Sequence, residues 1–265
     1  MKEQFQIALL QSDIHWENIE ANLAMFEEKI WQVTGDPDLI LLPEMFSTGF
    51  SMNPQKLAEP VNSKTLRWMQ QLAAQTKAVI GGSYIVREGT TFFNRFYAVY
   101  PDGRSFHYDK KHLFGLAGEA NDYAPGEKRV IFEVAGWRIM PIICYDLRFP
   151  VWIRSQKQPS ALYEYDLLIC VANWPVPRVN AWDTLLAARA IENLSYCAGV
   201  NRLGRDGVDA GYSGHSAIYN YKGDRMDYAE EETVVQASLS REALVQFRER
   251  FPFQGDADPF TLDYF

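Results

Sequence analysis

The order of apolar and polar positions in the first third of the chain predicts strands and helices in alternation. Residues 5–13 (FQIALLQSD) contain a short apolar run, which predicts a strand. Residues 16–33 predict an amphipathic helix, because apolar residues recur there every three or four positions. Residues 38–44 (DLILLPE) form a continuous apolar run with a polar end, which is typical of a strand buried on both faces. A helix over 63–77 and a strand over 78–86 follow, so the pattern predicts an α/β fold.

The second half of the chain repeats this order. We predict a strand over 166–175, a helix over 181–196 and a strand over 197–204. Each half then reaches a hairpin, over 93–104 and over 214–225, in which alternating residues flank a turn built on glycine. Similar units half a chain apart predict an internal pseudo-repeat rather than a solenoid, whose periods are shorter.

No stretch rich in proline, glycine or serine separates the two halves, so we expect one domain over residues 1–265. Two sheets, each covered by helices on one face and by the other sheet on the opposite face, would explain both the apolar strands and the hairpins. A helix is expected over 241–250. The aromatic segment 251–265 has too little periodicity for a core of its own, so it either packs along the body or reaches a neighbouring subunit.

Charge and composition argue against several kinds of partner. The formal net charge is −8 and no block is rich in lysine or arginine, which argues against a nucleic-acid partner because phosphate binding needs a basic face. The apolar run near the N-terminus is too short for a signal peptide or a membrane span, so we expect a cytoplasmic protein with no membrane partner. The three cysteines form no CxxC pair and the four histidines show no metal-ligand spacing, so we expect reduced thiols, no metal and no cofactor.

Three predicted strand ends carry polar residues suited to catalysis, and catalytic groups of α/β sheets gather at the carboxyl ends of strands. Glu44 ends one apolar run, Cys144 ends another (RIMPIIC), and Lys110 follows the first hairpin. A cysteine at a strand end is either a core residue or a nucleophile, and a nucleophile needs a base or a cation beside it. Cys170 and Cys197 lie inside apolar runs, so we predict them to be core residues.

These blocks resemble those of a known family. LLPEMFSTGF, YDKKHLF and ICYDLRFP, in that order, look like the three signature blocks of the nitrilase superfamily, the carbon–nitrogen hydrolases with a Glu–Lys–Cys triad. NWP, LLAARAIEN, GVNRLGRDG and GHSAI are similar to further family segments, so the resemblance covers nearly the whole chain. It implies a four-layer α-β-β-α sandwich, a small-molecule amide as substrate and a homodimer.

The resemblance also implies the roles of individual residues. Cys144 would be the nucleophile and Glu44 the general base. Lys110, together with the backbone N–H of Tyr145, would stabilise the oxyanion. Glu119, placed ahead of a Pro-Gly pair, matches the second glutamate that supports the lysine and the base in many members.

Some residues invite a catalytic role that we do not assign. His112 suggests a Cys–His dyad, but the base of the resembled family is a carboxylate, so we favour a structural hydrogen bond for it. Glu192 is either a partner of Arg189 or a charge on a helix face. Three tryptophans are expected in the core or in a pocket wall: Trp152, Trp174 and Trp182.

Within the superfamily, PEMFSTGFSMN, CYDLRFPVW and ANWPVPR look most like the bacterial ω-amidase branch, which hydrolyses 2-oxoglutaramate to 2-oxoglutarate and ammonia. The carboxylate of such a substrate needs a cation. The candidates are Arg148, Arg178 and Arg202. Arg148 could instead form a salt bridge with Asp146 or with another acid. Tyr145 and Trp174 complete the predicted substrate-binding set.

Three alternatives stay open. A nitrilase would use the same triad to attack a nitrile carbon. An N-carbamoyl amino acid amidohydrolase is a second alternative, although Leu147 stands where such enzymes can carry one of two arginines. A catalytically silent member could serve in binding or assembly, but its mark would be the loss of the triad, and all three residues are present.

Overall fold

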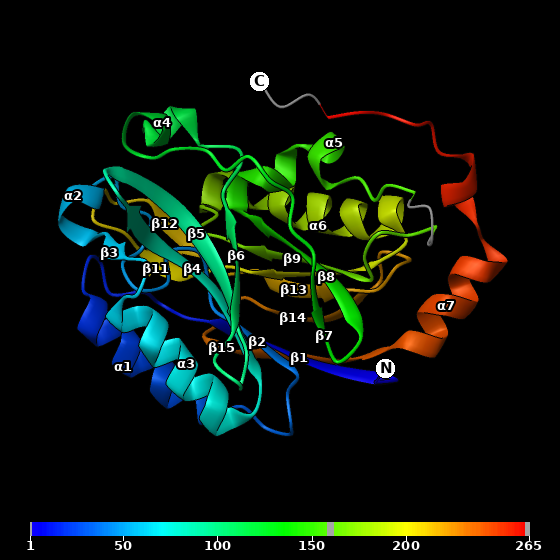
Figure 1. Ribbon diagram of the computed structural model, residues 1–265, viewed down its shortest axis with the longest axis horizontal. Helices are drawn as coiled ribbons and strands as arrows, with labels where there is room; N and C mark the ends of the chain where they lie inside the picture. Colours follow the sequence, from blue (N-terminus) through cyan, green and yellow to red (C-terminus); the bar gives the residue numbers. More distant parts are fainter. Residues whose placement is uncertain (1, 158–161, 263–265) are drawn as a thin grey trace.

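The computed structural model describes residues 2–157 and 162–262, and its central feature is a pair of stacked β-sheets (Figure 1). The first sheet contains β1 (Gln4–Gln11), β2 (Leu39–Leu41), β3 (Glu59–Pro60), β4 (Val79–Glu88), β5 (Thr91–Val99), β6 (Ser105–Asp109) and β15 (Thr233–Ser240). The second contains β7 (Phe132–Val134), β8 (Trp137–Ile143), β9 (Leu167–Val171), β10 (Tyr196–Val200), β13 (Ser216–Tyr219) and β14 (Arg225–Ala229). A separate ribbon pairs β11 (Leu203–Arg205) with β12 (Gly211–Ser213).

The two sheets share one strand order, which confirms the predicted pseudo-repeat. In the first sheet β1, β2 and β4 are parallel, β5 and β6 follow antiparallel, and β15 pairs antiparallel with β1. In the second sheet β8, β9 and β10 are parallel, β13 and β14 follow antiparallel, and β7 pairs antiparallel with β8. The second unit therefore begins with β8, and our expectation that it begins at residue 166 was wrong by one strand.

Alternate side chains of the strands face different layers, and this alternation produces the four-layer sandwich. In β1, Ala8 and Leu10 pack in the core formed with helices α1 (Ile19–Ile30) and α3 (Lys64–Thr76). Ile7 and Leu9 instead belong to the core shared with the second sheet.

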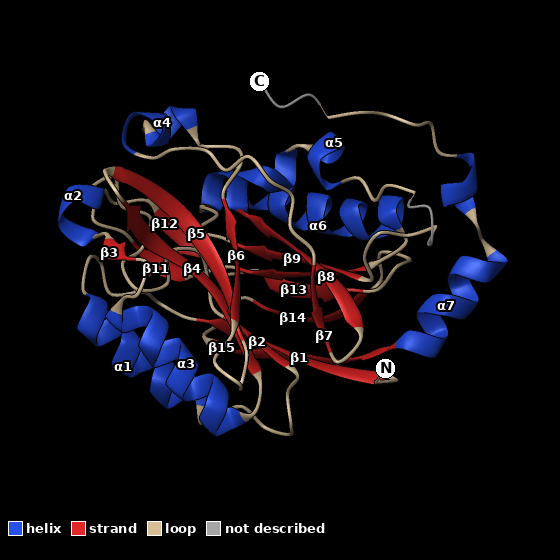
Figure 2. Ribbon diagram, in the orientation of Figure 1, coloured by secondary structure: helices blue, strands red, loops and turns tan. Residues whose placement is uncertain are grey.

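Helix α6 (Val179–Asn193) covers the outer face of the second sheet, where its Trp182 and Leu186 lie against β10 at Gly199. A Cβ on Gly199 would lie within 2.6–2.8 Å of these two side chains, so glycine permits this close approach. Figure 2 shows helices on both outer sides of the paired sheets, as expected for an α-β-β-α sandwich.

Side-chain caps fix the starts of three helices. Asn18 accepts a hydrogen bond from the N–H of Ala21 at the start of α1, and Ser63 accepts one from Leu66 in α3. Ser240 caps α7 (Arg241–Arg250) in the same way. The other helical segments are short: α2 (Pro54–Leu57), α4 (Glu119–Asp122), α5 (Pro150–Ile153) and the 3₁₀ turns η1 (Gly115–Ala117), η2 (Cys144–Arg148), η3 (Val176–Arg178) and η4 (Phe253–Asp256).

Several predicted elements are shorter in the structure: the helix expected over 16–33 spans Ile19–Ile30, and the strand expected over 166–175 ends at Val171. The helix expected over 181–196 ends at Asn193, because Leu194 adopts a left-handed conformation with φ of 46° and Tyr196 already belongs to β10. The strand expected over 197–204 is divided, since β10 ends at Val200 and the chain then pairs with β12. Strands β7 and β15 were not predicted.

The segment after α7 packs along the body of the protein rather than away from it. Gln254 donates a hydrogen bond to the carbonyl of Ser155, and Leu262 packs against the core shared by the two sheets. Residues 263–265 of the expected tail lie outside the described residues. Within the described ranges, no helix combines the length and the apolar character needed to cross a bilayer. The single domain over 1–265 stays a prediction.

A buried ion pair attaches α7 to the second sheet. Asp166, directly before β9, accepts hydrogen bonds from Arg248 of α7 at 2.8 Å and from the guanidinium of Arg138 in β8 at 3.1 Å. Burial alone would raise the pKa of Asp166, but the hydrogen bonds from Arg138 and the charge of Arg248 outweigh burial and lower this pKa below its usual value. The carboxylate therefore stabilises the fold in its charged form.

We predict that Asp166→Asn lowers the free energy of unfolding by about 3 kcal/mol at pH 7, because the guanidiniums of Arg138 and Arg248 lose a buried charged partner. The difference between the wild type and the variant should be constant at neutral pH and shrink as the pH falls below about 4. The carboxyl of the unfolded wild type takes up its proton there, while that of the folded protein does so only at a lower pH. Urea denaturation at several pH values measures both effects. Asp224→Asn, which removes an exposed partner of Lys222, is the control, and equal losses in the two variants would contradict the role of Asp166.

Candidate active site

Glu44 lies at the carboxyl end of β2, at the junction of the two sheets. Its side chain is completely buried. One oxygen, Oε1, accepts hydrogen bonds from Lys110 Nζ at 2.9 Å and from Asn94 Nδ2 at 2.8 Å. The other, Oε2, accepts one from the backbone N–H of Asn173 at 2.8 Å. The following residue, Met45, has a φ of 43°, which is uncommon for a side chain other than glycine and marks a sharp turn after the strand.

Lys110 follows β6, and its ammonium is buried between two carboxylates. Besides Glu44, Nζ contacts both carboxylate oxygens of Glu119, at 2.9 and 3.0 Å. Burial alone would lower the pKa of Lys110, but the negative charges of Glu119 and Glu44 outweigh burial and raise it. Lys110 is therefore a fixed cation. Glu119, the first residue of α4, is positioned by the backbone N–H of Phe114 as well as by the lysine.

Cys144 follows β8 and begins the turn η2 with a φ of 47°, so it is a strained residue at the end of a buried strand. The residue as a whole is partly exposed, and Sγ lies 3.9 Å from the carbonyl oxygen of Asn173. Burial raises the pKa of the Cys144 thiol well above its ordinary value, the negative charge of Glu44 adds to this effect, and Lys110 opposes it. The resting thiol is therefore protonated at neutral pH and needs a base.

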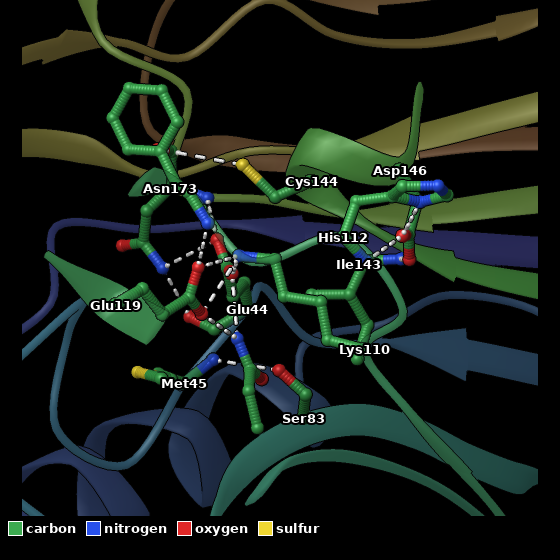
Figure 3. A network of polar contacts seen from close by, with 12 residues as sticks. Glu44, Met45, Ser83, Lys110, His112, Glu119, Ile143, Cys144, Asp146 and Asn173 are labelled. Atoms are coloured by element: carbon green, nitrogen blue, oxygen red, sulfur yellow. Dashed lines mark hydrogen bonds and ion pairs between the residues drawn. The ribbon is translucent and has the colours of Figure 1, made fainter. Parts of the chain in front are cut away.

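Asp146 fixes the turn that carries Cys144 relative to the segment that carries Lys110. Its carboxylate accepts hydrogen bonds from the backbone N–H of Ile143 at 3.0 Å, from the backbone N–H of His112 at 2.9 Å and from Tyr108 Oη at 2.7 Å. His112 Nδ1 lies 2.8 Å from the same carboxylate. Figure 3 shows Asp146 and His112 on one side of Cys144, with Glu44 and Glu119 on the other. His112 thus pairs with Asp146, which fits the structural role that we favoured.

The Cys144 side chain lines a cavity of about 140 Å³. Lys110 and the four residues predicted to bind substrate also line it: Tyr145, Arg148, Trp174 and Arg178. The guanidinium of Arg148 lies 4.8 Å from the centre of the Trp174 ring, and that of Arg178 lies 5.1 Å from the centre of the Phe114 ring. Among the described residues, neither guanidinium is paired with a carboxylate, so both are free to bind an anion.

Two possibilities that the sequence left open for the arginines do not occur in the structure. Asp146 does not pair with Arg148, because its carboxylate is occupied by the neighbours described above. Arg202 does not line the cavity. Its completely buried guanidinium donates to the carbonyls of Leu203 and Ile14 and contacts Asp13, and so it connects the loop after β1 to β11.

Sequence reasoning missed two asparagines that contact Glu44. Asn173 donates from its backbone N–H to the Glu44 carboxylate and from Nδ2 to the Glu44 carbonyl at 2.6 Å. Its position after the buried strand β9 was a usable signal, since Glu44 and Cys144 were found in the same way. Asn94 lies inside β5, and an isolated polar residue in an alternating strand gives no such signal.

The remaining sequence predictions in this region are accounted for by packing. Cys170 and Cys197 are completely buried core residues, as predicted. Trp152 and Trp182 belong to the core, whereas Trp174 forms part of the cavity wall. Glu192 accepts a hydrogen bond from Arg189 at 3.1 Å. Across residues 2–157 and 162–262, no three His, Cys, Asp or Glu side chains are grouped so that they could hold a metal ion.

The sequence model of one protein family, the carbon-nitrogen hydrolases, matches residues 6–249 of this chain. The chain belongs to this carbon–nitrogen hydrolase family. It is 44% identical to the omega-amidase YafV of Yersinia enterocolitica, over 97% of this chain and 98% of that protein. It is 31% identical to the 2-oxoglutaramate amidase of Bacillus subtilis, over 96% and 97% of the two chains.

A solved relative has nearly the same structure. The crystal structure of a carbon–nitrogen hydrolase superfamily protein from Xanthomonas campestris, with an arsenic adduct in its active site, is 40% identical with a TM-score of 0.96. It covers 99% of this chain, and this chain covers all of it. With the curated relatives, this likeness shows a nitrilase-superfamily amidohydrolase that acts on carbon–nitrogen bonds other than peptide bonds.

The geometry makes a testable statement about Glu44 and the Cys144 thiol. If Glu44 takes the proton of Cys144, Glu44→Gln should slow the alkylation of Cys144 by iodoacetamide at pH 7 by about 100-fold, the order of magnitude of general-base catalysis. If Glu44 acted through its charge alone, removing that charge would lower the pKa of the Cys144 thiol and speed alkylation. Peptide mapping by mass spectrometry measures the rate, with the buried Cys170 and Cys197 as unreactive internal controls, and faster labelling of the variant would exclude the base role.

Proposed function

We propose that this amidohydrolase cleaves the terminal amide of a small ω-amide of a 2-oxo acid, such as 2-oxoglutaramate, to the acid and ammonia. One observation carries the proposal: the Cys144 thiol opens into a cavity that also holds the guanidiniums of Arg148 and Arg178, and neither has a carboxylate partner among the described residues. A substrate with an amide at one end and a carboxylate at the other fits this arrangement. The relatives named omega-amidase and 2-oxoglutaramate amidase support the same substrate class.

The first chemical step forms a bond between Cys144 and the substrate. Glu44 takes the thiol proton as Sγ attacks the amide carbon, and the carbonyl electron pair moves onto oxygen. The ammonium of Lys110, which lines the cavity, and the backbone N–H of Tyr145 at the start of η2 stabilise the resulting oxyanion. Removing one such donor typically lowers kcat by about 10²–10³.

The second step releases ammonia and the third releases the acid. Glu44 passes its proton to the amide nitrogen, the carbon–nitrogen bond breaks, and an acyl thioester remains on Cys144. A water molecule then gives its proton to Glu44 and attacks the thioester carbon, which returns the thiol and yields the carboxylic acid. Glu119 takes no proton in this scheme, and its role is to hold Lys110 in place.

The far end of the substrate is bound by arginine. Arg148 and Arg178 approach the cavity from η2 and η3, and each guanidinium is packed against an aromatic ring, which limits its freedom before substrate arrives. Guanidinium groups bind carboxylates through two parallel hydrogen bonds. The nitrilase and N-carbamoyl amino acid amidohydrolase alternatives use the same triad and differ only in what the cavity accepts.

The place of action and the assembly are part of this proposal. We propose a cytoplasmic enzyme, which is supported by three free cysteines, one of which must stay reduced to react. We also propose a homodimer, on the strength of the resemblance to the nitrilase superfamily. Light scattering after size-exclusion chromatography should then give about twice the chain mass of 30.4 kDa.

The proposed substrate can be tested by comparing the protein's activity on several compounds. Ammonia release should be most efficient, by kcat/KM, with 2-oxoglutaramate, compared with glutamine, a simple aliphatic amide, an N-carbamoyl amino acid and a nitrile. Cys144→Ala should lower turnover by at least about 10⁴-fold, as loss of a nucleophile does in other hydrolases, while Cys170→Ala should keep most of it. A higher kcat/KM for another panel member, still dependent on Cys144, would show that the proposed substrate is wrong and would leave the proposed mechanism in place.

The arginine roles predict a selective loss. Arg148→Gln and Arg178→Gln should each lower kcat/KM for 2-oxoglutaramate by about 10- to 100-fold, the loss expected for a hydrogen bond to a charged group. A neutral aliphatic amide should be hydrolysed at nearly the wild-type rate. Arg67→Gln, on the exposed face of α3, is the matched control and should affect neither substrate. Equal losses for both substrates would show that the arginines only support the fold.

A further inference from the structure

Asn94 contacts three residues of the site from inside a β-strand. It lies in β5 with only 1% of its surface exposed. Its Nδ2 donates to Glu44 Oε1 at 2.8 Å and lies 3.5 Å from Glu119 Oε1. Its carbonyl oxygen accepts the backbone N–H of Lys110 at 3.0 Å. One asparagine thus lies between the two glutamates and also fixes the backbone of the lysine.

The side-chain amide of Asn94 directs its N–H groups at the two carboxylates and leaves its own oxygen without a partner. Asn94 Oδ1 is buried and has no hydrogen-bond partner among the described residues. A buried acceptor without a partner is costly, so a purely structural residue at this position would be apolar. Turning the amide over would place Oδ1 against two carboxylate oxygens, which would repel it. The observed orientation therefore indicates that the N–H donor is what this position supplies.

The charges around this donor do not balance. Two buried carboxylates, those of Glu44 and Glu119, share the single ammonium of Lys110. Burial raises the pKa of Glu119, and the nearby charge of Glu44 adds to this effect, while Lys110 opposes it. Among the residues that the structure describes, the other titratable groups that face this cluster are the Cys144 thiol, after β8, and the Tyr123 hydroxyl, after α4. Neutral donors must therefore decide which carboxylate carries the charge.

We propose that Asn94 is a positioning residue that keeps Glu44, rather than Glu119, as the charged base beside Cys144. Its donor completes the set on Glu44, which already accepts from Lys110 and from the backbone of Asn173. Glu119 accepts from Lys110 with both oxygens and from the Phe114 backbone, and its oxygen lies farther from Asn94 Nδ2 than that of Glu44 does. The inference rests on the proposed role of Glu44 as the base, and it adds that Asn94 keeps Glu44 in the state that this role needs.

Two substitutions separate the electrostatic role of Asn94 from packing. Asn94→Ala should lower kcat/KM by about 10- to 100-fold, as expected for loss of a donor to a charged group. KM should stay close to the wild-type value, and the acid limb of the pH profile should move up by about one unit. At pH 8, Asn94→Asp should have a lower kcat/KM than Asn94→Ala, because it adds a third carboxylate to the cluster. The difference in kcat/KM between the two variants should become smaller as the pH falls, because a protonated Asp side chain can donate a hydrogen bond to Glu44.

A matched control tests whether these effects are merely structural. Asn193 is also completely buried, accepts from the backbone of Ser155 and donates to the carbonyl of Arg189, and lies at the end of α6. Asn193→Ala should lower the melting temperature comparably and leave the pH profile in place. An acid limb that stays in place in Asn94→Ala, with kcat/KM within about threefold of the wild type, would overturn the proposal.

The alkylation of Cys144 keeps this test independent of the substrate. The pH dependence of its reaction with iodoacetamide should move in the same direction as the acid limb in Asn94→Ala, and it requires no turnover. If the wild type hydrolyses no amide of the panel, the proposed function fails while this alkylation profile still decides the role of Asn94. An unchanged alkylation profile in Asn94→Ala would reject the inference whatever the substrate.

Discussion

The ammonium of Lys110, buried between the carboxylates of Glu44 and Glu119, is the contact on which the rest of the site depends. Each of these ions would cost several kcal/mol to bury alone, so none is stable there without the others. The pairing fixes Lys110 as a cation in the cavity wall and holds the carboxylate of Glu44 in the same cluster as Lys110 and Cys144. Glu44 loses its negative charge when it takes the proton of the Cys144 thiol, and the negative charge then lies on the attacking sulfur.

The pseudo-repeat explains how these groups meet. β2 and β9 are the second parallel strands of the two sheets, and their ends carry Glu44 and Asn173, which hydrogen-bond to each other. β8 is the first parallel strand of the second sheet, and its end carries Cys144. Stacking two similar sheets face to face therefore places carboxylate, amide and thiol at one junction. The positive φ values of Met45 and Cys144 show that the chain is bent sharply at two of these strand ends.

The sequence was informative where chemistry coincides with the end of an apolar run. Glu44 and Cys144 could be found because each interrupts a buried strand, and Glu119 because its spacing matches the resembled family. Asn94 could not be found, since its importance depends on which side chains lie across the sheet. The sequence also did not show where the arginine side chains point. Arg148 and Arg178 line the cavity, whereas Arg202 donates hydrogen bonds to backbone carbonyls. Tertiary contacts set the turns that decide these directions. Strands β7 and β15 are short or irregularly buried, so pairing rather than periodicity defines them.

The central claim is that hydrolysis passes through a thioester on Cys144. The most direct measurement adds hydroxylamine during turnover of 2-oxoglutaramate, quenches the reaction early, and maps any acyl group on the digested protein by mass spectrometry. The account predicts a mass increase on the Cys144 peptide equal to the substrate minus ammonia, and diversion of part of the product from the acid to the hydroxamate. Continued turnover that gives the acid alone, with no acyl group on Cys144 and no hydroxamate, would mean that water attacks the amide directly and would contradict the account.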